Sequence, residues 1–168
     1  GRVLLTNLFI SDEDVKHSLP YLLEFLPRMK QVFGSISGGS SFKYGLFYHK
    51  QKKCWITGSP AKPIALTEEE AIQKATAIKN DLVKGAEIIN NRKNKLIGIS
   101  DYESLYDMLH DVNGIDSVWI LKYYQMLFPD ILPVFYSKEI QLEVLRFLKC
   151  DPSIFPFVRM GQIALYLK

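Results

Sequence analysis

The sequence predicts an α+β fold: a single, mainly helical domain of five or six helices with one β-hairpin around residues 42–57. Apolar residues recur at helical spacing over most of the chain, whereas residues 42–57 alternate in character around a polar tip. The chain has no internal repeat, and its strands and helices do not alternate as they do in a parallel sheet. Its 168 residues match the size of one domain, which can bury a core without disulfides.

The first segment, residues 11–34, is expected to form two short helices. Ser11 is a suitable N-cap, and the acidic residues after it suit a helix N-terminus. Pro20 and Pro27 interrupt the helical spacing of the leucines around them. A further strand is expected near residues 3–9.

The stretch GSISGGSS comes next and spaces Gly34 and Gly39 as a phosphate-binding loop does. Ser40 and Ser41 follow in place of the lysine and hydroxyl residue that such a loop requires. Without the lysine no cation faces the terminal phosphates of a nucleotide. We therefore interpret this stretch as a connector and not as a nucleotide site.

Residues 42–49 carry the strongest strand pattern in the chain. Every second side chain is apolar or aromatic, which places one set on a common face: Phe42, Tyr44, Leu46 and Tyr48. The sequence KQKK at 50–53 is a plausible hairpin tip, and CWITG at 54–58 is the expected return strand.

The strongest helix pattern begins at Thr67, which forms a capping-box motif with Glu70. Its apolar stripe consists of Ala71, Ala75, Ile78, Leu82, Ala86 and Ile89. We expect this helix to end at residues 90–91. Ser100 and Glu103 repeat the capping-box motif and predict a second helix start, with a stop at Gly114.

A third helix is predicted within residues 116–130, ending at Pro129. Trp119 and Tyr123 are expected in the core, whereas Lys122 falls on another face of this helix and is expected to be exposed.

Ser137 is expected to cap the next helix, and Pro152 is expected at the first position of the last one. The final residues are apolar at helical spacing and carry no stop signal. The chain is therefore expected to be cut from a longer protein at its C-terminal end.

The net charge is only +3, but the charged residues are unevenly distributed. No acidic residue occurs between Glu24 and Glu68, and seven cations lie in that interval: Arg28, Lys30, Lys43, Lys50, Lys52, Lys53 and Lys62. A second basic cluster consists of Arg92, Lys93 and Lys95. A local basic patch can attract a polyanion even when the total charge is small.

Several chemistries have no motif in this chain. It lacks paired Cys/His ligand spacing, H-E-x-x-H, G-x-S-x-G and the carboxylate–lysine cluster of metal-dependent nucleases. We therefore predict no catalytic residue, no metal site and no cofactor. Cys54 and Cys150 are far apart and are expected to be free thiols in a reducing compartment, the cytoplasm. No apolar run is long enough for a membrane helix.

The basic-aromatic hairpin is the candidate binding site. Lysines neutralise phosphates, and aromatic rings stack on unpaired bases. The predicted nucleic-acid-binding residues are Lys43, Tyr44, Tyr48, His49, Lys50, Lys52, Lys53, Trp55, Lys62, Arg92, Lys93 and Lys95. The alternative interpretation is structural, since lysines also protect hairpin tips and edge strands, and strand aromatics usually pack.

Five short stretches resemble the N-terminal region that precedes the AAA+ GTPase motor in some McrB-type proteins, which belong to modification-dependent restriction systems. The stretches lie within residues 53–167 and are WITG at 55–58, EEAI at 69–72, WILKY at 119–123, FPD at 128–130 and RMGQ at 159–162.

The resemblance implies that residues 1–168 are a non-catalytic N-terminal specificity domain that binds DNA, methylated or otherwise modified. It further implies a GTP-using AAA+ motor in the same chain and a McrC-like nuclease subunit as partner. The alternative is a protein-interaction or adaptor domain fused to an NTPase motor, with no nucleic-acid contact of its own.

Overall fold

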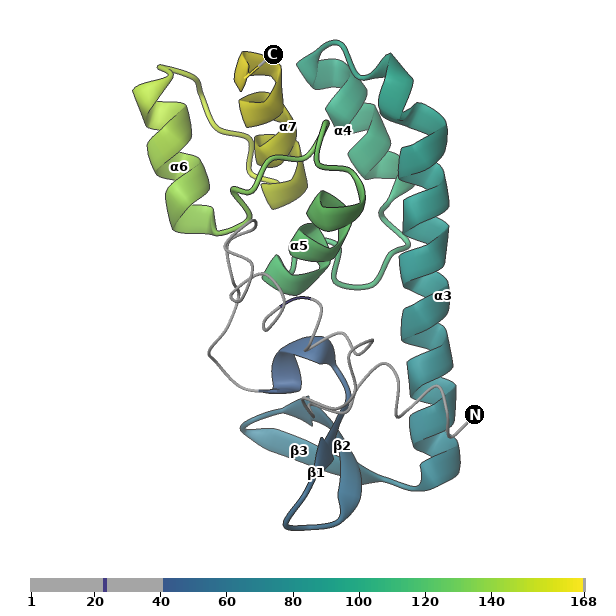
Figure 1. Ribbon diagram of the computed structural model, residues 1–168. Helices are drawn as coiled ribbons and strands as arrows, with labels where there is room; N and C mark the ends of the chain where they lie inside the picture. Colours follow the sequence, from purple (N-terminus) through teal and green to yellow (C-terminus); the bar gives the residue numbers. More distant parts are fainter. Residues whose placement is uncertain (1–22, 24–40, 168) are drawn as a thin grey trace. The chain divides into compact units, whose positions relative to one another are not determined.

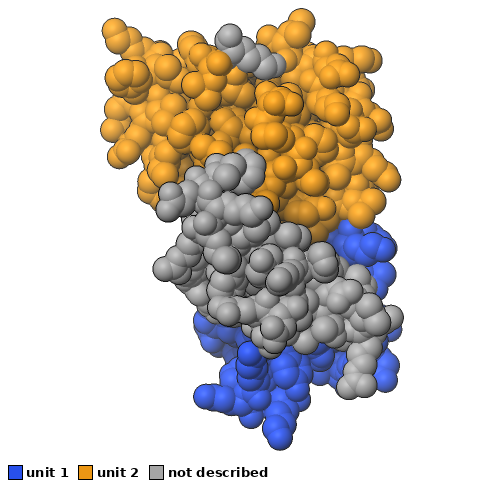
Figure 2. All heavy atoms as spheres, in the orientation of Figure 1, with its two compact units in different colours: residues 1–80 blue, residues 81–168 orange. Residues whose placement is uncertain are grey.

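The structure of the chain is a computed structural model that describes Leu23 and residues 41–167. It divides into two compact units, residues 1–80 and residues 81–168, which Figure 2 colours separately. The strand predicted near residues 3–9, the helices predicted within 11–34 and the connector at 34–40 lie outside the described residues. The described fold is α+β and mainly helical, as the sequence predicts, with five α-helices and one antiparallel sheet.

In the first unit a 3-10 helix, η2 (Ser41–Tyr44), precedes a three-stranded sheet (Figure 1). Its strands are β1 (Phe47–His49), β2 (Cys54–Ser59) and β3 (Lys62–Leu66), with β2 in the middle. Trp55 on β2 is paired with Tyr48 on β1 and with Leu66 on β3. Since directly paired residues share a face of a sheet, these three side chains lie on the same face.

The predicted hairpin is confirmed, but its first strand is shorter than expected. Residues 41–44 form η2 and not a strand, and Gly45 follows with a φ of 76°. A glycine in this left-handed conformation reverses the chain and limits β1 to three residues. Thr57 fixes this bend, since its Oγ1 donates a hydrogen bond to the carbonyl of Gly45 at 2.6 Å. The third strand, β3, was not predicted at all.

The long helix α3 (Glu68–Arg92) begins where its capping box predicts. The Glu70 N–H donates to Thr67 Oγ1 at 3.2 Å, and the Thr67 N–H donates to Glu70 Oε2 at 2.8 Å. The boundary between the two units falls inside this helix, after Asn80.

The N-cap of helix α4 (Ile99–Met108) lies two residues before the N-cap predicted at Ser100. Its N-cap is Gly98, and Asp101 supplies the cap: Oδ2 accepts from the N–H groups of Gly98 and Ile97 at 2.9 and 3.0 Å. The Ser100–Glu103 box is therefore wrong, because Ser100 already lies in the first turn of the helix and Asp101 at the third helical position bonds back to the N-cap N–H of Gly98.

Helix α5 (Val118–Leu127) contains the clearest error in predicted burial. Lys122 is fully buried, although it was expected to be exposed. Its ammonium donates to the hydroxyl of Tyr136 at 3.3 Å and lies 5.0 Å from the centroid of that ring. The segment after α5 therefore covers the helix face that the sequence pattern assigned to solvent. Trp119 is buried, as predicted.

Helices α6 (Lys138–Phe147) and α7 (Pro156–Leu167) complete the second unit, and α7 packs against both α4 and α6. Ser137 caps α6, as predicted, by accepting a hydrogen bond from the Ile140 N–H at 3.4 Å. The last helix begins at Pro156 and not at Pro152, although a proline does occupy its first position. No helix within the described residues has the length and apolar character needed to cross a membrane.

Candidate nucleic-acid interface

The predicted basic stretch folds into one small structure in the first unit. Residues 41–67 contain five lysines, no arginine and no acidic residue, so they carry a charge of +5. That charge exceeds the +3 of the whole chain, so the rest of the chain is net negative. The positive charge is concentrated on η2 and the three-stranded sheet.

The turn that joins β1 to β2 gathers three of these lysines within four residues, and we call residues 50–53 the lysine turn. Lys50, Lys52 and Lys53 are all exposed. None of the three forms an ion pair with a residue in the described part of the chain. No carboxylate of the described residues therefore neutralises their mutual repulsion, and a bound polyanion would relieve it.

The lysine turn has a defined backbone. The Lys52 N–H donates a hydrogen bond to Nδ1 of His49 at 3.3 Å, which closes the turn onto the end of β1. Lys53 has a φ of 49°, in the left-handed region that glycine or asparagine usually occupies. His49, a predicted site residue, is half-buried and serves this turn through its ring nitrogen.

The aromatic side chains differ in how accessible they are. Tyr48 is 36% exposed, whereas Trp55 and Tyr44 are buried at 9% and 3%. The rings of Tyr48 and Trp55 meet edge to face with centroids 5.2 Å apart. Trp55 therefore supports Tyr48 from within the sheet, and Tyr48 alone of the three predicted aromatics is open to an incoming base.

The remaining predicted residues fall in two places. Lys43 is half-buried on η2, with its Nζ 5.2 Å from the centroid of the Tyr44 ring, and Lys62 is exposed on the edge strand β3. The second basic cluster, Arg92, Lys93 and Lys95, is exposed at the end of α3 and on the short 3-10 helix η3 (Lys93–Lys95) in the second unit. The structure thus places the lysines of residues 43–62 on η2, the lysine turn and β3 of the first unit, and the 92–95 cluster in the second unit.

Sequence reasoning missed one feature of the site. The sheet has a third strand, and its exposed Ile64 is paired with Thr57 on the face that carries Tyr48. The signal was weak because β3 contains Pro63, which removes a backbone donor and is tolerated only at an edge.

Metal-binding side chains do not cluster in this part of the chain. Among the described residues no group of three or more His, Cys, Asp or Glu side chains could hold a metal ion. Cys54 and Cys150 are both free thiols, as predicted. Comparisons with protein-family models, curated proteins and solved structures find no match to this chain.

Proposed function

We propose that this protein is a non-catalytic DNA-binding domain and that the lysine turn contacts the phosphate backbone. One observation carries the proposal: an acid-free stretch with a charge of +5 folds into η2 and one sheet, and a single turn exposes three lysines that pair with no carboxylate of the described residues. Each lysine that neutralises a phosphate releases counterions, which favours binding to any DNA sequence.

Tyr48 supplies the second element of the proposed interface. It is the middle residue of β1, two residues from Lys50, and its ring packs edge to face on the buried Trp55. An aromatic ring that stacks on a base contributes about 1–3 kcal/mol to binding. We assign to Tyr48 contact with a base and to the lysine turn contact with phosphates, so the two should differ in how they affect sequence preference.

The resemblance to McrB-type proteins supports a more specific role. In this proposal the domain selects target DNA, modified at a base, for a restriction protein whose AAA+ motor lies in the same chain. A McrC-like nuclease subunit cuts the DNA, and the domain itself neither cuts DNA nor hydrolyses GTP or ATP.

A second function class has one observation in its favour. On helix α6, Ile140 is 47% exposed and Phe147 is 86% exposed. Because these residues are seven apart, they lie on the same face of the helix. Exposed apolar side chains of this kind favour a protein-interaction domain. This alternative predicts no binding to DNA at any salt concentration.

The experiment that separates the two classes is a binding assay with unmodified and cytosine-methylated duplexes at low and moderate salt. If three lysines contact phosphates, these contacts alone weaken the affinity about 40-fold between about 50 and 200 mM salt. Tyr48→Ala should reduce any preference between the two duplexes and leave the salt dependence of binding unchanged. Absence of binding to both duplexes at the lower salt concentration would overturn the proposal and favour the interaction domain.

A further inference from the structure

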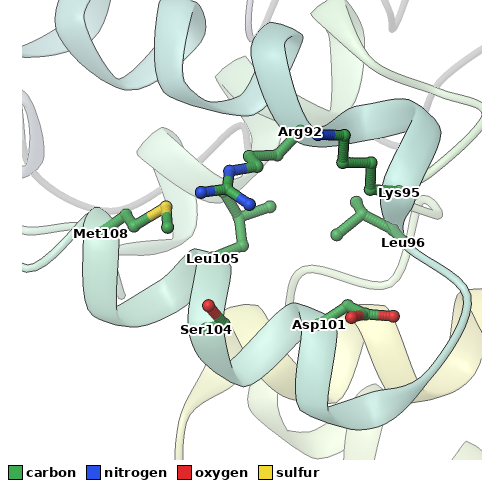
Figure 3. Close-up of a pocket in the computed structure, with 7 residues that line it drawn as sticks. All are labelled: Arg92, Lys95, Leu96, Asp101, Ser104, Leu105 and Met108. Atoms are coloured by element: carbon green, nitrogen blue, oxygen red, sulfur yellow. The ribbon is translucent and has the colours of Figure 1, made fainter.

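The second unit contains a small pocket between the end of α3, η3 and α4 (Figure 3). Arg92 and Lys95 line one side of it, and Ser104 and Asp101 of α4 line the other. Its floor is apolar and is formed by Leu96, Leu105 and Met108. We call this the η3–α4 pocket. All of its residues belong to the second unit.

Two cations line the pocket, Arg92 and Lys95. In Figure 3 the Arg92 guanidinium extends toward Leu105 and Met108, and the Lys95 side chain runs back toward Arg92. Neither cation forms an ion pair with a residue in the described ranges. Both residues line the pocket, so an anion bound there would be attracted by two positive charges.

Asp101 does not neutralise these cations. Its Oδ2 accepts hydrogen bonds from the N–H groups of Ile97 and Gly98, which directs the carboxylate to the N-terminus of α4. The Ser104 hydroxyl is exposed and can donate a hydrogen bond to an anion in the pocket. The pocket therefore offers a guanidinium, an ammonium and a hydroxyl as donors to one anion.

The volume of the pocket restricts the class of ligand. It measures about 40 Å³, far below the few hundred Å³ of a site for a nucleoside or a drug-sized molecule. A bound water needs roughly 10–15 Å³ on this measure, so the space suits about three oxygen-sized groups. That is the size of one phosphate group presented by a larger molecule that remains outside.

We propose that the η3–α4 pocket binds one phosphate of a nucleic-acid backbone, as a contact separate from the lysine turn. This inference rests on the proposed function, because the phosphate belongs to the same bound DNA. Arg92 is the main donor, since a guanidinium can hold two phosphate oxygens at once, and Lys95 adds a second positive charge. Lys93 lies between them in the sequence but does not line the pocket.

A purely structural explanation makes a different prediction. Cations at the end of a helix stabilise the helix dipole, and Arg92 ends α3. In that case replacing Arg92 and Lys95 would lower the melting temperature without changing the binding of phosphate or DNA.

The experiment compares two double variants. The pocket variant combines Arg92→Gln and Lys95→Gln. The control variant combines Lys138→Gln and Lys149→Gln, which removes two exposed lysines elsewhere in the second unit. Inorganic phosphate is titrated at constant ionic strength and followed by backbone NMR shifts, and duplex DNA is titrated at several salt concentrations. We expect saturable phosphate shifts at Leu96 and Ser104 that only the pocket variant loses. We also expect that variant to bind DNA about tenfold more weakly. Its plot of log affinity against log salt should be less steep by about one unit.

The results separate the two proposals. If the pocket variant binds DNA as the parent does while Ala variants of the lysine turn bind it more weakly, the proposed phosphate contact in the pocket is wrong and the proposed function stands. Phosphate binding without an effect on DNA would assign the pocket to free phosphate and also overturn the inference. If Lys93→Gln weakens phosphate binding as much as Lys95→Gln does, the cluster acts as a diffuse patch. Should the double variant fail to fold, Ser104→Asp tests the same site by adding a carboxylate at an exposed position.

Discussion

Two lysines share an unusual backbone conformation and differ in the surface they occupy. Lys53 has a φ of 49° in the lysine turn, and Lys149 has a φ of 57° just after α6. Lys149 occupies the position where helices commonly carry glycine. The Cys150 N–H donates to the Leu145 carbonyl and the Lys149 N–H to the Arg146 carbonyl, both at 3.0 Å, which is the Schellman pattern. The left-handed conformation strains both lysines. Only Lys53 belongs to the proposed DNA-binding surface, so only there does the positive charge offer a functional reason for a strained side chain.

This pair gives a matched test at the scale of single residues. Lys53→Gly and Lys149→Gly each remove one positive charge and relieve one left-handed side chain. Each should raise the free energy of unfolding by about 0.5–1 kcal/mol, measured by urea denaturation. Only Lys53→Gly should also weaken DNA binding and make its salt dependence less steep, by about one unit of slope. If both variants lost the same DNA affinity, the proposed role of the lysine turn would be contradicted.

At the scale of elements, local signals predicted well and long-range packing did not. The Thr67–Glu70 box lies within four residues, so it was readable and correct. The burial of Lys122 depends on Tyr136, fourteen residues away, and no pattern within the helix reveals it. Strand β3 was missed because it is defined by its pairing with β2 more than by its own residues.

The candidate site shows the same division. Its lysines could be found from the sequence, because an acid-free run is visible without a structure. The roles of the aromatics could not be predicted, because they depend on the order of the strands: Tyr48 is exposed on the edge strand β1, whereas Trp55 is buried on the central strand β2. The volume and lining of the η3–α4 pocket also depend on how α3 and α4 pack, which no local motif encodes.

The contact between α4 and α7 depends on one glycine. A Cβ at Gly161 would collide with the ring of Tyr102, which is fully buried and donates to the carbonyl of Ile131 at 2.9 Å. We expect Gly161→Ala to lower the free energy of unfolding by about 1–3 kcal/mol, despite the better helix propensity of alanine. Gly98→Ser is the control, since a Cβ there meets only ordinary contacts and serine is a good N-cap. A Gly161→Ala variant as stable as the parent would contradict this packing.

At the scale of the whole molecule, buried tyrosines predict how stability depends on pH. Burial raises the pKa of Tyr102 and Tyr136 from 10.0 to about 12. In the unfolded chain both ionise near the ordinary value, whereas in the folded chain they keep their protons. Their contribution to stability is therefore complete below pH 10 and is lost as the pH rises from 10 to 12.

The expected loss is about 1.4 kcal/mol per pH unit for each tyrosine that ionises only after unfolding. Urea denaturation at several alkaline pH values measures it, with phenolate absorbance as a direct record of ionisation. Tyr102→Phe should make the stability less dependent on pH in this range. A Tyr102→Phe variant with the parent's pH dependence would contradict the assignment.

The positive charge of the molecule is concentrated in a short part of the chain. Residues 41–67 carry +5 in a chain whose total is +3, and the lysine turn presents three of these charges. The central claim is that these three lysines contact DNA phosphates. A solvated turn with the same charges would contribute nothing specific when compared with exposed lysines elsewhere.

The most direct measurement is the slope of log affinity for DNA against log salt concentration. Three proteins are compared: the parent, a variant with Ala at Lys50, Lys52 and Lys53, and a control with Ala at Lys79, Lys138 and Lys149, which are also exposed. The proposal predicts that the turn variant binds more weakly and loses about 0.9 units of slope for each phosphate contact removed, while the control keeps the parent slope. A turn variant with the parent's affinity and slope would contradict the account.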